Sequence, residues 1–130
     1  MFEKHIKKYG SRTIEDIEKN IWGEPEYDSY LVKTCHRLRK KQLQLFTVED
    51  LRIMIGQNIG TEHLLPFALI QLSQNILSEG DFYPGDLVNS ILQVDAQFWK
   101  NHPEYYTAVK ELIEKNKKLL FENKIEYKHF

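Results

Sequence analysis

The stretch TEHLLPFALIQLSQNIL, residues 61–77, constrains the fold of this 130-residue chain more than any other. Drawn as a helix, it carries apolar side chains around almost its whole circumference, so we expect it to be the central, most buried helix. The composition, 42% hydrophobic and 28% charged residues, supplies enough apolar surface for a core around it. We expect Pro66 either to open or to kink this helix, because an interior proline loses one backbone hydrogen bond.

Helix-start signals recur along the rest of the chain, whereas period-two alternation is nowhere sustained. Thr13 and Thr47 each precede an aspartate by three positions, an acidic variant of the capping box, and Asp28 can cap a third helix. Together with the apolar spacing, these signals predict helices at 13–22, 29–41, 47–58, 61–77, 84–94 and 103–122, and a short turn of helix at 95–101. The fold class is therefore all-α, a single compact domain over residues 1–130 with six to seven short helices plus a longer C-terminal one.

Cysteine usage and the longest apolar run bear on the compartment. Cys35 is the only cysteine, so no internal disulfide can form, and its place on an apolar stripe indicates a core residue. The longest uninterrupted apolar run, residues 64–70, is too short to cross a bilayer, and the first twelve residues lack a signal-peptide core. These features predict a cytoplasmic protein that does not bind membranes.

Charge is strongly sorted along the chain although the net charge is only −1. Residues 13–28 carry six acidic side chains against one lysine, whereas residues 29–44 carry five basic side chains and no acidic one. Between Arg52 and Lys100 there is no lysine or arginine, and the charged side chains there are five carboxylates. Such sorting favours a protein with a cationic partner.

Three of those five carboxylates fall in EGDFYPGD, residues 79–86. Pro84 and Gly85 are typical of a turn, after which Asp86 can cap a helix that begins at Leu87. Alternatively, Pro84 is itself the first helical residue and Asp86 lies in the first turn. We expect Phe82 and Tyr83 to pin this loop onto the core. Glu79 and Asp81 have no evident structural role, so they are free to face a partner.

Three segments in this order and spacing resemble one family of proteins. WGEPEYDSYLVKTCHRLRKK, FTVEDLRIMIGQNIG and EGDFYPGDLVNSIL, followed by FW and HPE, are similar to immunity proteins of bacterial contact-dependent growth inhibition systems. The resemblance covers about residues 13–104. It implies a small cytoplasmic protein that binds the C-terminal toxin domain of its own strain's exported effector, often a nuclease. It implies no catalysis and no cofactor.

Two acidic segments with aromatic residues are candidate toxin-binding surfaces, since a cationic nuclease surface attracts carboxylates and aromatic residues often anchor interfaces. Residues 79–86 contribute Glu79, Asp81, Phe82, Tyr83 and Asp86, and residues 15–28 contribute Glu15, Glu18, Trp22, Glu24, Glu26 and Tyr27. Either segment can face the toxin. Because partner-facing residues of immunity proteins differ between strains, the family-like residues 79–86 can equally be scaffold.

The alternative function is a helical regulator that binds nucleic acid through the basic residues 33–41. The adjacent acidic segment and a pI of about 6.5 favour instead a solvated helix face paired with those acids. An enzyme would need converging catalytic groups, but the five histidines are scattered and no zinc-ligand spacing occurs. We therefore predict no catalytic residue, no metal, no cofactor and no small-molecule substrate.

Overall fold

The computed structural model describes residues 2–128 and residue 130. Every regular element in this part of the chain is helical, which confirms the predicted all-α class. The elements are α1 (Glu3–Tyr9), α2 (Ile14–Glu18), α3 (Tyr30–Leu38), the 3₁₀ turn η1 (Leu43–Leu45), α4 (Val48–Gly56), α5 (Thr61–Gln74), α6 (Asp86–Leu92), α7 (Ala96–Asn101), α8 (Pro103–Lys115) and α9 (Lys117–Glu122). The prediction missed α1, and it joined α8 and α9 into one helix.

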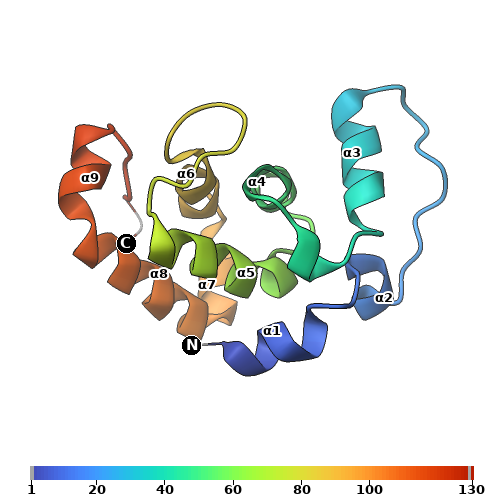
Figure 1. Ribbon diagram of the computed structural model, residues 1–130, viewed down its shortest axis with the longest axis horizontal. Coiled ribbons are helices and arrows are strands. Elements are labelled where there is room, and N and C mark those ends of the chain that lie inside the picture. Colours follow the sequence, from blue (N-terminus) through green and yellow to red (C-terminus); the bar gives the residue numbers. More distant parts are fainter. Residues whose placement is uncertain (1, 129) are drawn as a thin grey trace.

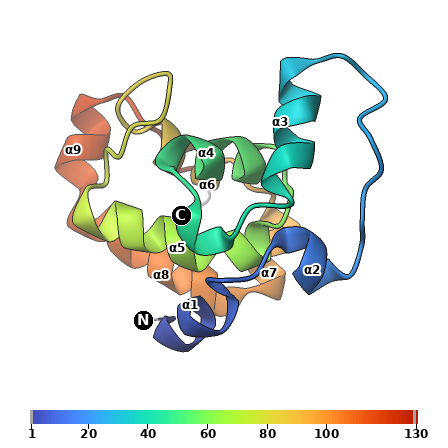
Figure 2. The same cartoon turned by 45° about the vertical axis from the view of Figure 1, so that its right-hand side comes forward.

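Helix α5 lies in the middle of the structure, as its apolar circumference predicts. Helices α4 and α6 lie above it and helices α1 and α8 lie below it in Figures 1 and 2. Leu64, Leu65 and Ala68 of α5 have no exposed surface. Cys35 is also buried, at 5% exposure, and burial raises the pKa of its thiol.

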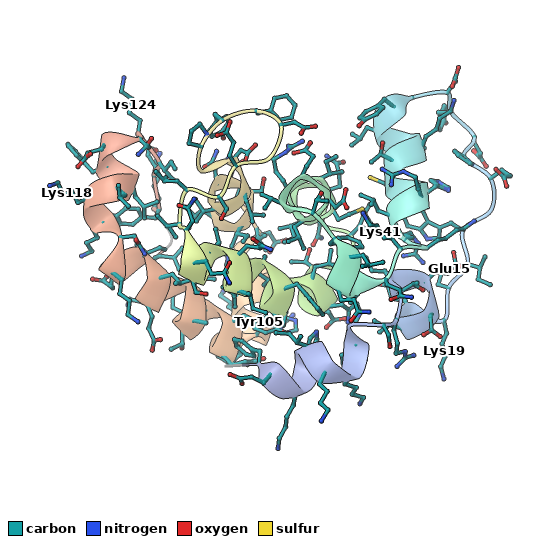
Figure 3. All side chains as sticks on the ribbon, in the orientation of Figure 1. Glu15, Lys19, Lys41, Tyr105, Lys118 and Lys124 are labelled. Carbon is teal, nitrogen blue, oxygen red and sulfur yellow. The ribbon has the colours of Figure 1, made fainter. Side chains whose placement is uncertain are left out.

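Pro66 lies inside α5, as its sixth residue. Proline has no N–H, so the carbonyl oxygen of Glu62 lacks its usual helical donor at this point. The hydroxyl of Tyr105 donates a hydrogen bond to that oxygen from α8, across 2.8 Å. Tyr105 lies beneath α5 in Figure 3 and is only 7% exposed. A side chain 43 residues away therefore supplies the hydrogen bond that the proline removes.

The capping signals set the starts of two helices as predicted. Thr47 and Asp50 form a complete capping box at α4, and the Thr13 hydroxyl accepts the Asp16 N–H at α2. Helix α2 nevertheless ends at Glu18, so the predicted extension to Trp22 is wrong. Lys19 takes a left-handed conformation, with φ of 53°. Its N–H and that of Asn20 bond back to the last turn, which is the Schellman arrangement that usually uses glycine.

Two further predicted boundaries are wrong for local reasons. Ser29, and not Asp28, caps α3 by accepting the Val32 N–H, while Asp28 forms an ion pair with Lys33. The predicted helix 103–122 is interrupted at Asn116, whose side-chain amide donates to the Leu112 carbonyl oxygen at 2.8 Å. This local hydrogen bond competes with the helical pattern and separates α8 from α9.

The chain between α2 and α3 forms a long loop that stands away from the rest of the structure (Figures 1 and 2). We call residues 19–29 the arch. Over the described residues, no helix is both long and apolar enough to span a membrane.

Candidate protein-binding site

Residues 79–86, which we call the octet loop, are shaped from inside by Asp86. Its carboxylate accepts the N–H groups of Gly80 at 2.7 Å and Phe82 at 3.1 Å, and only 2% of the residue is exposed. Helix α6 begins at Asp86, so Asp86 lies in its first turn, as one alternative predicted, and does not cap it. Pro84 lies in the preceding turn, so the prediction that it is the first helical residue is wrong. Gly85 precedes it at φ of 91°, with Ile125 only 2.4 Å from where a Cβ would lie. Asp86 therefore builds the loop and offers little surface to a partner.

Helix α4 supports the octet loop from the side through an ion pair that sequence reasoning missed. Glu49 accepts the Asp81 N–H at 2.9 Å and two hydrogen bonds from Arg52 at 2.6 Å each. Hydrogen bonding to Arg52 lowers the pKa of Glu49 and raises that of the guanidinium. Arg52 also lies 3.9 Å from Asp86. The octet loop thus has a basic neighbour in space, although its own stretch of sequence contains none.

Phe82 and Tyr83 point outward, which corrects the prediction that they pin the loop onto the core. Phe82 is 67% exposed and Tyr83 is 43% exposed. The Phe82 ring lies over the Arg52 guanidinium at 4.4 Å, and the Tyr83 hydroxyl accepts a hydrogen bond from Asn89 at 2.7 Å. Glu79 and Asp81 are exposed beside these rings. The buried and half-buried carboxylates fix the backbone, so the two rings are held facing solvent.

The arch is anchored by Arg39, a second arginine that sequence reasoning did not single out. Its side chain is 2% exposed and donates to Glu18 at 2.7 Å and to the Asn20 carbonyl oxygen. The Trp22 ring lies 4.2 Å from the guanidinium. Glu18 and Trp22, both predicted partner-binding residues, therefore hold the base of the arch in the free protein.

The other predicted residues of this segment divide into two groups. Glu15, labelled in Figure 3 on α2, is half-buried, and its Oε2 is buried without a hydrogen-bond partner. Glu24, Glu26 and Tyr27 are exposed along the arch, with Tyr27 at 70%. Two apolar residues that the sequence analysis did not select, Ile21 and Tyr30, are each 76% exposed nearby.

The basic segment 33–41 is largely paired with carboxylates. Lys33 pairs with Asp28 and Arg39 with Glu18, which confirms the predicted pairing with the acidic segment. Lys41 pairs with Asp50 at 2.6 Å. Among the described residues this leaves Arg37 and Lys40, which are exposed, as the bases of the segment without an ion pair. A surface with so few free cations is a weak match for a phosphate backbone.

The octet loop and the arch do not form one surface. Figure 1 shows the octet loop and α3 with the arch on either side of α4, and Figure 2 agrees. The structure thus keeps the two predicted segments apart. No group of three or more His, Cys, Asp or Glu in the described part of the chain could hold a metal ion.

Comparison of the sequence with known proteins and protein families identifies one matching family. No curated protein matches the chain. The family model described as CDI immunity proteins, where CDI stands for contact-dependent growth inhibition, matches residues 16–109. The match spans the arch, α4, α5, the octet loop and α6, and so includes both candidate surfaces. It covers well over half of the sequence, and the chain therefore belongs to the CDI immunity protein family.

Proposed function

We propose that this protein neutralises the toxin domain of its own strain's exported effector by binding it in the cytoplasm, with no catalysis and no cofactor. Family membership supports the immunity role. The observation that carries the binding surface is the pair of outward-facing rings, Phe82 and Tyr83, on a loop whose backbone is already fixed.

Exposed aromatic rings on a fixed loop suit a binding surface for two reasons. Aromatic side chains are enriched among the few residues that carry most of the binding energy. A loop held by Asp86 and Glu49 loses little conformational freedom on binding, which leaves more of the contact energy as affinity. Exposing Phe82 at 67% forgoes the energy of burying it, so a partner that covers it gains that energy.

The charge of this surface favours a cationic toxin, such as a nuclease that binds a phosphate backbone. Glu79 and Asp81 are exposed next to the rings, while the neighbouring base Arg52 is already bound to Glu49. Complementary charge speeds encounter and rejects toxins of other strains whose charges do not match. The arch, with Glu24, Glu26 and Tyr27, is the second candidate surface within the same function.

The test uses the toxin domain encoded by the gene directly upstream. The purified chain should form a stable complex with it and block its activity. Reversing two charges in Glu79→Lys/Asp81→Lys should slow association at least about tenfold at low salt, with a smaller effect at high salt. The matched control is Glu104→Lys/Glu111→Lys on α8, on the opposite side of α5 in Figure 1, which should leave the association rate close to wild type.

Two results would count against this proposal. If the wild-type chain does not bind the toxin domain, the immunity function by direct binding is wrong. If it binds but both double variants associate at the same rate, the toxin contacts another surface, and charge reversal at Glu24 and Glu26 on the arch becomes the next measurement.

A further inference from the structure

A polar hollow of about 340 Å³ adjoins the octet loop. We call it the α4–α6 hollow, because residues of both helices line it. Its polar lining consists of Asn58, Tyr83, Asn89, Ser90, Gln93 and Asp95, and none of its lining residues is basic. Tyr83 belongs to the octet loop and its hydroxyl accepts a hydrogen bond from Asn89, so the hollow continues the surface that carries the exposed rings.

Two helix ends give this hollow a negative character. Helix α4 ends at Gly56 and helix α6 ends at Leu92, and residues from the last turn of each line the hollow. The carbonyl groups at a helix C-terminus carry a partial negative charge that attracts cations. Two such ends next to each other, with no base among the lining residues, favour a positively charged occupant.

Asp95 adds a full negative charge at the rim. Its Oδ1 accepts the N–H groups of Gln97 at 2.6 Å and Phe98 at 3.3 Å, which caps α7. Within the described residues its Oδ2 accepts no hydrogen bond and forms no ion pair. Lys124 and Lys128 line an adjoining hollow that shares Asp95 with this one, and Lys128 is already paired with Glu126 at 3.4 Å.

We propose that the α4–α6 hollow receives one arginine or lysine side chain of the bound toxin. This inference rests on the proposed function, and it names the chemistry that the toxin must present beside the octet loop. Amide, hydroxyl and carboxylate oxygens around the hollow can accept several N–H groups at once, and the planar guanidinium of arginine presents five. A cation enclosed in this way sets how long the complex lasts, whereas the exposed Glu79 and Asp81 set how fast it forms.

Two substitutions test the hollow without removing its structural supports. Asp95→Asn removes the charge but keeps a good helix cap at α7. Gln93→Lys places a cation of the chain's own in the hollow. Each should raise the dissociation rate of the toxin complex at least about tenfold, since hydrogen bonds to charged groups are the strong ones. Asp95→Asn should leave the association rate within about twofold of wild type.

The control is Glu104→Gln, which removes one exposed carboxylate on α8 and should leave both rates unchanged. Urea unfolding of each variant checks that the fold is intact before binding is measured. A double-mutant cycle of Asp95→Asn against single Arg→Gln and Lys→Gln variants of the toxin should find one toxin residue whose effect depends on Asp95.

The outcomes separate this inference from the proposed function. If the wild-type chain binds the toxin but Asp95→Asn and Gln93→Lys dissociate at the wild-type rate, the hollow is empty in the complex and this inference is overturned, while the immunity function stands. If the wild-type chain does not bind, the proposed function fails and this inference fails with it.

Discussion

The hydrogen bond from Tyr105 to α5 replaces the one that Pro66 removes, and its contribution can be measured. In Tyr105→Phe the Glu62 carbonyl oxygen loses a hydroxyl 2.8 Å away. Because Tyr105 is only 7% exposed, water replaces the hydroxyl poorly. We expect the free energy of unfolding to fall by about 1–2 kcal/mol, the usual cost of leaving a buried acceptor unpaired.

A second substitution shows whether the hydroxyl stands in for the missing N–H. Pro66→Ala restores an N–H that can donate to the same carbonyl oxygen along α5. In that background Tyr105→Phe should cost about 0.5 kcal/mol or less. The assay is urea unfolding of the four proteins followed by circular dichroism. If Tyr105→Phe costs the same in both backgrounds, within about 0.3 kcal/mol, the reasoning is refuted.

Two shorter predictions concern pH and the octet loop. Burial raises the pKa of Tyr105 to about 12, so the folded protein keeps the phenol neutral where the unfolded chain ionises it. The free energy of unfolding should therefore fall by up to about 3 kcal/mol as pH rises from about 10 to 12. Subtracting the pH profile of Tyr105→Phe from that of the wild type isolates this loss. Asp86→Ala removes the acceptor of the Gly80 and Phe82 N–H groups and should lower the free energy of unfolding by about 2–4 kcal/mol, whereas the exposed control Asp81→Ala should stay within about 0.5 kcal/mol. Equal costs for the two aspartates would show that Asp86 does not hold the loop.

The sequence predicts those parts of the fold that depend on neighbouring residues. The capping box at Thr47 and Asp50 and the apolar circumference of α5 are local patterns, and both hold in the structure. The end of α2 is also set locally, by the left-handed conformation of Lys19. Glycine is the usual residue for that conformation, so a lysine in the sequence does not predict a helix end. The break between α8 and α9 depends on the hydrogen bond from the Asn116 side chain to Leu112, which helix propensities do not predict.

The sequence predicts only part of the candidate site, because it shows which residues are neighbours along the chain and not which residues meet after folding. The residues of the octet loop are adjacent in sequence and therefore in space, so the sequence predicts the acidic and aromatic character of the loop. The supporting residues were not, because Glu49 and Arg52 come from a helix about thirty residues earlier and meet the loop only after folding. Arg39 reaches Glu18 across 21 residues, and no period or motif links them. The distribution of charge along the sequence therefore identifies both loops, but it does not predict the ion pairs that fix each loop to its neighbouring helix.

Both candidate loops are held in the same way, and this explains why exposed rings and buried charges occur together. In each, an arginine pairs with a carboxylate and packs against an aromatic ring: Arg52 of α4 with Glu49 and Phe82, and Arg39, which directly follows α3, with Glu18 and Trp22. The two differ in the exposure of the ring. Trp22 is half-buried, so its packing energy is already used to fix the arch, whereas Phe82 is mostly exposed and retains apolar surface for a partner. On this physical ground we propose the octet loop for the central contact with the toxin and the arch for the rim of the interface.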